Sequence, residues 1–239
     1  MSAFPRDFGR RPPIAQIAPR VSGLAALGAS IFVLAAVGHL LAERTGAPLW
    51  ALALKPVPVL LLLLRVLRAP ESPLRWGVAA GLVASAVGDV VIGLPGAFLA
   101  GVAFFLAAHI GYAGGFLRAA PSLRLLRAVP FALFGFGMAW WIGEGARELR
   151  WAVTVYIVGI CLMMWRSAAL LGEARLPAGV GGAALTGALF FAASDSLIAI
   201  HRFVRPLAWA EVPIMVLYWI GQAGIAAAAV RASRGSATT

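Results

Sequence analysis

Ionisable side chains lie inside five long apolar stretches of the sequence: Lys55, Asp89, His109, Asp195 and Glu211. An ionisable group inside a membrane span is costly to insert, so it faces the interior of a helix bundle and is a functional candidate by default. Paired carboxylates such as Asp89 and Asp195 suit general acid and base catalysis, because their surroundings can keep one carboxyl protonated and the other ionised. The first chemistry that the sequence indicates is therefore proton transfer inside a membrane.

The depth of these groups follows from their distance to the ends of the apolar stretches. At a rise of about 1.5 Å per residue, Lys55, Asp89 and Asp195 share a layer roughly 7 to 11 Å from the side opposite the chain termini. A second polar group lies deeper, at about 18 to 24 Å: His109, Tyr218 and Gln222. We therefore expect a column of polar groups in a cavity that opens to one leaflet.

Several of these residues also have a structural interpretation. Lys55 suits the role of a buried counter-ion to a carboxylate as well as that of a contact for a substrate phosphate. Ser85, one turn before Asp89, suits a hydrogen bond to a backbone carbonyl. The three tyrosines suit packing with a satisfied hydroxyl group: Tyr112, Tyr156 and Tyr218. His39 and His201 lie near span ends, where water reaches them.

Eight apolar stretches must position these groups. Of the 239 residues, 62% are hydrophobic and 12% charged, whereas a soluble domain is roughly half apolar and a quarter charged. This composition excludes a soluble globular domain and a disordered chain. Stretches of about 20 apolar residues, the length of a membrane-crossing helix, occur at 21–42, 48–67, 74–94, 96–117, 127–145, 150–171, 178–200 and 206–230. Because barrel-type alternation is absent, we predict an all-helical membrane bundle of eight transmembrane helices.

The basic residues predict the orientation of this bundle. One membrane domain, 21–230, lies between a basic arm, 1–20, and a short tail, 231–239. The arm, the even-numbered loops and the tail hold fourteen Lys and Arg residues, and the odd-numbered loops hold five. The positive-inside rule then places both termini in the cytoplasm. The net charge of +11 reflects topology and anionic headgroups rather than nucleic-acid binding.

Two pairs of segments indicate an internal repeat. Segment 88–94 is similar to 194–200, and segment 110–114 is similar to 220–224. Both pairs lie four spans apart and run in the same direction, as a four-plus-four parallel duplication requires. Chance similarity between apolar segments is the alternative.

Two other function classes fit the same charges. A transporter, or a lipid-handling or sensor protein, also places charges at mid-membrane and can arise from a duplication. A zinc-dependent hydrolase would use His39, His109 and His201 with an aspartate. Because no two histidines share a span and His109 differs from the others in depth, the sequence disfavours zinc. We expect neither a metal nor another cofactor.

The order of these residues resembles the YhhN-type lysoplasmalogenase family. The resemblance covers about residues 30–230 and rests on five motifs: Lys-Pro at 55–56, Gly-Asp at 88–89, Phe-Phe-x-x-x-His-x-x-Tyr at 104–112, Ser-Asp-Ser at 194–196 and Tyr-Trp-x-x-Gln at 218–222. Val57 stands where we expect a leucine from the family pattern, which is a conservative difference. Each motif is weak alone and specific in combination.

This resemblance implies hydrolysis of the vinyl ether bond of lysoplasmalogens to a fatty aldehyde and glycerophosphoethanolamine or glycerophosphocholine. The family's two conserved aspartates map to Asp89 and Asp195, which are therefore the implied catalytic residues. The candidate substrate-binding residues are Lys55, Ser85, His109, Tyr112, Tyr156, Ser194, Tyr218 and Gln222. The implied partners are a lysophospholipid and the lipid bilayer, here the cytoplasmic membrane of a bacterium. Headgroup, chain length and oligomeric state are left open.

The chemistry of a vinyl ether agrees with a pair of acids. Cleavage begins with protonation of the β-carbon, which gives an oxocarbenium ion that water attacks, so a positioned general acid is needed. A second carboxylate stabilises the cation and takes a proton from the water, as in glycosidases. We favour Asp195 as the proton donor, because Ser194 and its small neighbours leave a tight, dry site. Asp89, beside Gly88 and one turn from Ser85, is then the ionised partner.

Overall fold

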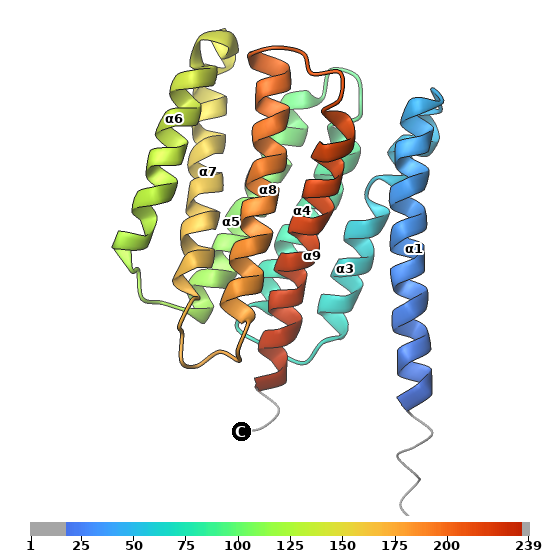
Figure 1. Ribbon diagram of the computed structural model, residues 1–239, viewed down its shortest axis with the longest axis vertical. Coiled ribbons are helices and arrows are strands. Elements are labelled where there is room, and N and C mark those ends of the chain that lie inside the picture. The colour runs from blue at the N-terminus through green and yellow to red at the C-terminus, as the bar shows by residue number, and fades with distance from the viewer. Residues whose placement is uncertain (1–17, 236–239) are drawn as a thin grey trace, which may run out of the picture.

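A computed structural model describes residues 18–235 as a bundle of helices joined by short loops (Figure 1). Over these residues the secondary structure is helical, without a strand. An α-helix satisfies its own backbone hydrogen bonds, which lipid cannot do, so long apolar runs fold in this way. The prediction of an all-helical protein is confirmed. Residues 1–17 of the predicted basic arm and 236–239 of the predicted tail lie outside the described residues.

Nine α-helices make up the described part of the chain: α1 (Ala18–Arg44), α2 (Pro48–Leu54), α3 (Val57–Arg68), α4 (Arg75–Val91), α5 (Phe98–Ala119), α6 (Val129–Ala146), α7 (Arg150–Ala169), α8 (Val180–Phe203) and α9 (Glu211–Gly235). Single turns of 3-10 helix precede α6, at Leu125–Ala128, and α7, at Arg147–Leu149. Six stretches are long and apolar enough to cross a membrane. The stretch Leu125–Ala169 contains both α6 and α7, and α4, with 17 residues, is not among the six.

The second predicted span is divided into α2 and α3 at Lys55 and Pro56. Proline lacks a backbone N–H group and its ring crowds the preceding turn, so it breaks a helix. Pro58 follows in the first turn of α3. The backbone N–H of Lys55 donates to the carbonyl oxygen of Ala51 over 3.1 Å. This hydrogen bond closes the last turn of α2. The break places the half-buried Lys55 side chain at the junction of the two helices.

Glycines bring the helices of two pairs close together. A Cβ atom added at Gly77 of α4 would lie 2.4 Å from Cα of Gly115 in α5, and one at Gly187 of α8 would lie 2.7 Å from the carbonyl oxygen of Gly221 in α9. Small residues permit this close approach, which gives van der Waals packing between membrane helices. The pairs α4–α5 and α8–α9 therefore form the centre of the bundle, while α1 packs at its edge on α2 and α3 (Figure 1).

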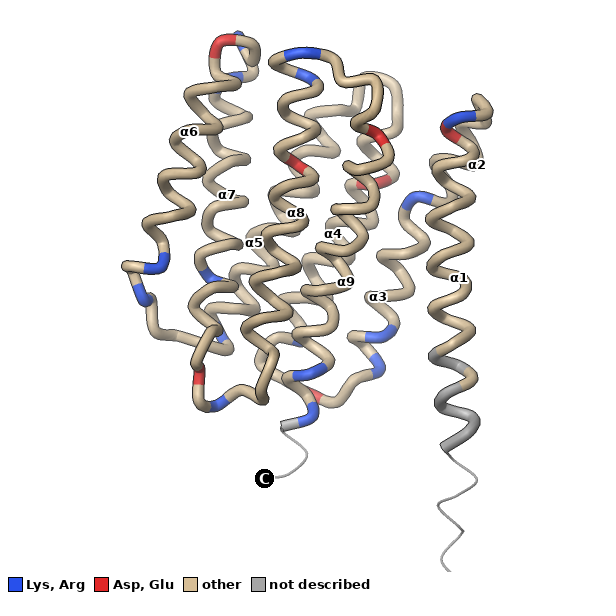
Figure 2. Tube along the Cα trace, in the orientation of Figure 1, with Lys and Arg blue, Asp and Glu red and all other residues tan. Residues whose placement is uncertain are grey.

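The surface and the interior of the bundle have the polarity expected in lipid. Large apolar side chains such as Leu126, Trp140 and Trp151 are exposed, whereas Asp89 and His109 are buried. Charged groups gather at the two ends of the bundle, and Lys and Arg crowd the end at which both described termini lie (Figure 2). A large apolar surface, with the few membrane-embedded polar groups turned to the interior, is typical of membrane proteins. The chain is an integral membrane protein.

Candidate active site

The first of two buried polar clusters surrounds Asp89. The Tyr218 hydroxyl of α9 donates a 2.8 Å hydrogen bond to Oδ2 of Asp89 in α4. The Tyr112 hydroxyl of α5 donates to Oε1 of Gln222 over 2.6 Å and lies 3.3 Å from Oγ of Ser85. Ser85 therefore contacts a side chain rather than the backbone carbonyl considered from its sequence position. Three helices, α4, α5 and α9, position this cluster.

The second cluster surrounds Asp195 and comes from α5, α7 and α8. The Tyr156 hydroxyl donates a 2.9 Å hydrogen bond to Oδ2 of Asp195. Nε2 of His109 lies 3.4 Å from the same oxygen, a close contact without hydrogen-bond geometry. The rings of His109 and Tyr156 pack edge to face with centroids 5.2 Å apart. Tyr156 thus does more than pack, because its hydroxyl fixes one oxygen of the acid.

Two phenylalanine rings lie between the clusters. Phe191 packs against His109 on one side and Tyr218 on the other, with centroid distances of 4.8 and 5.3 Å. Phe105 packs edge to face on Phe191 at 6.3 Å and on Tyr218 at 5.9 Å. The expected single column of polar groups is therefore wrong. Each aspartate has its own tyrosine, and the two groups are divided by aromatic rings.

The contact between His109 and Asp195 also corrects their predicted depths. The sequence places His109 about 12 Å deeper than Asp195 when both are counted from the expected span ends. In the structure α5 begins at Phe98, and α8 continues to Phe203. Counted from those residues, the two side chains differ by only about 5 Å along the helix axes, a gap that long side chains bridge. Hydropathy alone did not define the helix ends closely enough.

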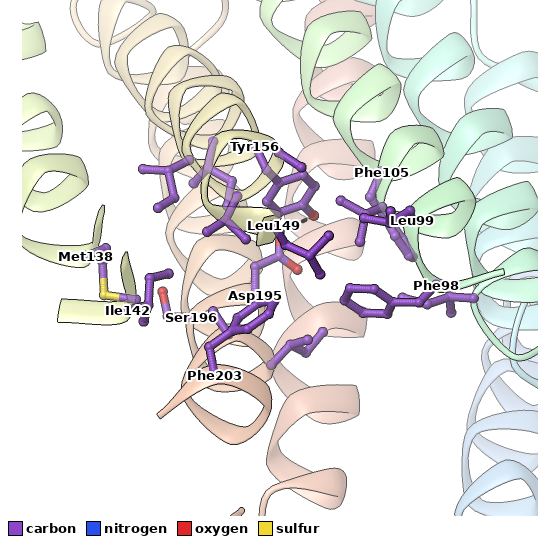
Figure 3. A pocket seen from close by; sticks show the side chains of 18 of the residues that line it. Phe98, Leu99, Phe105, Met138, Ile142, Leu149, Tyr156, Asp195, Ser196 and Phe203 are labelled. Atoms are coloured by element: carbon purple, nitrogen blue, oxygen red, sulfur yellow. Dashed lines mark hydrogen bonds between the residues drawn. The ribbon is translucent and has the colours of Figure 1, made fainter. Parts of the chain in front are cut away.

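An apolar pocket beside Asp195 is enclosed by α5, α6, α7 and α8 and has a volume of about 760 Å³, including the space at its open side. Figure 3 shows Tyr156 and Asp195 in its wall among apolar side chains such as Phe98 and Phe203. Asp89 does not line this pocket and is fully buried. Phe105 faces the pocket and also contacts Tyr218, the partner of Asp89. Asp195 is therefore directly accessible from the pocket, whereas Phe105 and Tyr218 lie between the pocket and Asp89.

Three further residues predicted to lie in the site have other positions. Lys55 makes no ion pair within the described residues and lies half-buried between α2 and α3. The hydroxyl of Ser194 donates to the carbonyl of Ile214 over 2.8 Å and so joins α8 to α9. Glu211 is the exposed first residue of α9. Of these three, Ser194 has a structural role, because its hydrogen bond joins two helices.

The histidines are separate from one another. His39 is buried, lies 2.9 Å from the carbonyl oxygen of Ala51 through Nδ1, and packs edge to face on Trp219. The expectation that water reaches His39 is wrong, because α2 folds back across this part of α1. His201 is exposed, and its Nδ1 accepts a hydrogen bond from the backbone N–H of Leu207. Between residues 18 and 235, no three His, Cys, Asp or Glu side chains gather in a way that could hold a metal ion.

Unpartnered polar atoms are concentrated around the two clusters. Among the described residues, Oδ1 of Asp89, Nε2 of Gln222 and Nε1 of Trp219 are buried without a hydrogen-bond partner. Nδ1 of His109 is likewise buried without a hydrogen-bond partner. A buried polar atom without a partner is costly, and such atoms are where water or the polar part of a ligand binds. The interior is thus equipped to hold a polar reactant.

Phe191 was missed in the sequence. A signal for it exists, because Phe191 precedes Asp195 by one helical turn and Phe105 precedes His109 by one turn. Residues four apart share a helix face, so an aromatic ring one turn from a polar site residue was a candidate to pack against it. The pairing of the two rings across α5 and α8 needed the fold.

Comparison with known proteins identifies the family of the chain. The YhhN family model matches residues 50–229. Lysoplasmalogenase TMEM86B of Sus scrofa is 36% identical over 196 residues, which are 80% of each chain. The lysoplasmalogenase of Mycobacterium bovis is 35% identical over 186 residues, 74% of this chain and 69% of the relative. No solved structure matches the chain. On the extent of the family match and the identity to these relatives, the chain belongs to the YhhN family.

Proposed function

We propose that the chain is a lysoplasmalogenase that hydrolyses the vinyl ether bond of a lysoplasmalogen to a fatty aldehyde and a glycerophospho headgroup. Relatives that carry this name cover most of the chain. The observation that carries the proposal is the carboxyl group of Asp195 in the wall of an otherwise apolar pocket. Ligand pockets place few polar groups among apolar ones. An alkenyl chain in this pocket would lie beside an acid.

Asp195 acts first, as the general acid. Its Oδ2 accepts the hydrogen bond from Tyr156, which leaves Oδ1 to carry the proton. Transfer of this proton to the β-carbon forms a C–H bond and breaks the π bond. The positive charge is then shared between the α-carbon and the ether oxygen. Tyr156 and His109 are positioning residues for this step, because both contact the carboxyl group.

Water completes the reaction with help from Asp89. The ionised Asp89 takes a proton from water as its oxygen bonds to the α-carbon, which gives a hemiacetal. Asp195 regains its proton from the hemiacetal hydroxyl as the aldehyde forms, and Asp89 returns its proton to the departing glycerol oxygen. One water is consumed and both acids are restored. Because Phe105 separates Asp89 from the pocket, this step requires the Phe105 ring to turn aside when substrate enters.

The remaining residues of the Asp89 cluster support its charge and its position. Tyr218 donates to one carboxylate oxygen. A hydrogen bond donated to a carboxylate favours its ionised form. Ser85, Tyr112 and Gln222 continue the hydrogen-bonded group toward the bundle centre. Their role in this proposal is to hold polar atoms near the reacting groups.

The chain crosses the membrane eight times in this proposal, with both termini in the cytoplasm of a bacterium. Successive helices are joined at alternate ends of the bundle, with α2 and α3 together forming one pass (Figure 1). The basic end holds the described termini (Figure 2), as the positive-inside rule requires of a cytoplasmic face. The domain 21–230 then carries the site, which opens toward the opposite leaflet.

The four-plus-four repeat also has structural support. Gly81 of α4 lies against Gly111 of α5, and Gly187 of α8 lies against Gly221 of α9. The interval from Gly81 to Asp89 equals that from Gly187 to Asp195. In addition, α3 packs on α4 and α9, while α7 packs on α8 and α5. These relations are those of two four-pass units, α1 to α5 and α6 to α9, and they put one aspartate in each.

The test of the function is aldehyde release by the purified, detergent-solubilised protein. A lysoplasmalogen is compared with its saturated alkyl-ether analogue, which has the same headgroup and chain but cannot be protonated to an oxocarbenium ion. The proposal requires equal amounts of aldehyde and glycerophospho headgroup from the first compound and neither product from the second. Absence of aldehyde from both would exclude the reaction, and equal cleavage of both would exclude the mechanism.

A further inference from the structure

One end of the pocket reaches the surface of the bundle. Its lining includes Phe98, the first residue of α5, and Phe203, the last residue of α8. Leu149, which ends the 3-10 helix between α6 and α7, lines it as well. All three are helix ends opposite the described termini (Figure 1). A lipid in the pocket would therefore have its polar headgroup at this end, where headgroups lie at the membrane interface.

A cation lies at this same end. The guanidinium carbon of Arg202 is 3.6 Å from the centre of the Phe98 ring, and that ring lines the pocket (Figure 3). The stacking extends the side chain from α8 toward α5 across the end of the pocket. Arg202 is exposed and makes no ion pair with the acids of the described chain. Stacking on an aromatic face holds a guanidinium in place while leaving its N–H groups to donate.

The helix register relates this cation to the acid. Arg202 follows Asp195 by seven residues on α8, which is close to two full turns, so both side chains leave the same face of the helix. At about 1.5 Å per residue, the two positions are roughly 10 Å apart along the axis. A cation at the end of the pocket is thus aligned above the acid in its wall.

We propose that Arg202 binds the phosphate group of a single-chain phospholipid substrate while Asp195 contacts its vinyl ether. This inference rests on the function proposed above. Seven bonds separate the β-carbon of the vinyl ether from the phosphorus, a span of about 8 Å in an extended chain at about 1.2 Å per bond. A guanidinium hydrogen bond to phosphate adds about 3 Å. The sum is close to the rise of about 10 Å between the two positions along the axis of α8.

Arg202 replaces Lys55 as the phosphate contact. Lys55 does not line the pocket and lies at the junction of α2 and α3. Arginine also suits the role better, since its planar group donates two parallel hydrogen bonds to phosphate. The phosphate, rather than the amine of the headgroup, is the element that this site recognises.

The experiment compares two substrates and three variants. The substrates are an alkenyl glycerophosphoethanolamine and the alkenyl glycerol of the same chain, which lacks phosphate. Arg202→Gln should raise KM for the first substrate by about tenfold or more, as expected for a lost charged hydrogen bond, with little change in kcat and no change for the second. Arg202→Lys should recover part of the loss. Arg205→Gln, which removes a neighbouring cation beyond the end of α8, should behave as the unaltered protein.

Two results would overturn the proposal. Equal changes for both substrates would show that Arg202 acts on the pocket or the fold, and no change for either would show that it binds no phosphate. Binding of the saturated alkyl-ether analogue to unaltered protein and Arg202→Gln, measured at equilibrium, separates this inference from the reaction. If the unaltered protein releases no aldehyde, the proposed function fails, while a phosphate-dependent loss of binding in Arg202→Gln would still establish the site.

Discussion

The hydroxyl of Tyr156 donates a 2.9 Å hydrogen bond to Oδ2 of Asp195, and both side chains line the same pocket. This bond leaves the other carboxyl oxygen of Asp195 free for the reactant in the proposed mechanism. It also joins α7 to α8 at the level of that carboxyl group. In the proposed mechanism the hydroxyl orients the acid and transfers no proton of its own.

Removing this hydroxyl should slow the reaction. Tyr156→Phe keeps the ring against His109 but deletes a hydrogen bond to the acid, and a bond of this class contributes about 1.5 to 3 kcal/mol. We expect kcat for aldehyde release to fall by roughly tenfold or more, with the melting temperature in detergent nearly unchanged. Thr154→Val is the matched control, since Thr154 lies on the same helix and donates only to the carbonyl of Arg150. An unimpaired Tyr156→Phe enzyme would remove Tyr156 from the mechanism.

The glycine contacts between helices predict a difference in stability. Ala in place of Gly187 would put a Cβ atom 2.6 Å from the backbone nitrogen of Ile225, and overpacking of this kind costs about 1 to 3 kcal/mol. Gly187→Ala should therefore lower the melting temperature. Gly182→Ala, five residues earlier on the same helix and with nothing within 4 Å of its added Cβ, should not. Equal melting temperatures for the two variants would contradict the close packing of α8 on α9.

The helical class followed from the sequence because lipid leaves the backbone no alternative and the apolar runs are long. The limits of the helices followed less well. Hydropathy does not reveal the break at Pro56, beside Lys55, because the apolar run continues across it. It also placed the end of α8 three residues before Phe203, where the helix ends. Such shifts are small in residues, but they decide which polar groups meet.

The sequence predicted which residues belong to the site, but not how they divide into two clusters. Asp89 and Asp195 stood out because carboxylates are rare inside apolar runs. That Phe105 and Phe191 divide them could not be inferred, because it depends on how α5 and α8 cross. Arg202 could not be predicted as a site residue for a similar reason. An arginine near the end of a span is usually interpreted as a topology signal, and its stacking on Phe98 is known only from the fold.

Activity should not depend on a metal ion. The three histidines are held by separate contacts, and His109 is the one that reaches an aspartate. We expect full aldehyde release after dialysis against a strong chelator, measured beside a chelator-treated zinc enzyme as a positive control. Loss of activity that zinc alone restores would favour a metal mechanism over the aspartates.

Both chain ends should be accessible from the cytoplasm. Reporter fusions after residue 20 and after residue 239 are expected to show cytoplasmic reporter activity, because the positive-inside rule places the basic end of the bundle in the cytoplasm. A fusion in the loop after α4, near Leu94, should report the opposite side. Export of both terminal reporters would invert the bundle and place the pocket in the inner leaflet.

The central claim is that carboxylic acids, and Asp195 first among them, carry out the hydrolysis. Asn keeps the shape of Asp but has no acidic proton, and general acid catalysis contributes about 10² to 10⁴ in rate. The decisive measurement is single-turnover aldehyde release from a lysoplasmalogen by Asp195→Asn and by Asp89→Asn, each shown to be folded by its melting temperature. We expect both rates to fall by about a hundredfold or more. Near-normal rates in two folded variants would show that the aspartates are structural and would contradict the mechanism.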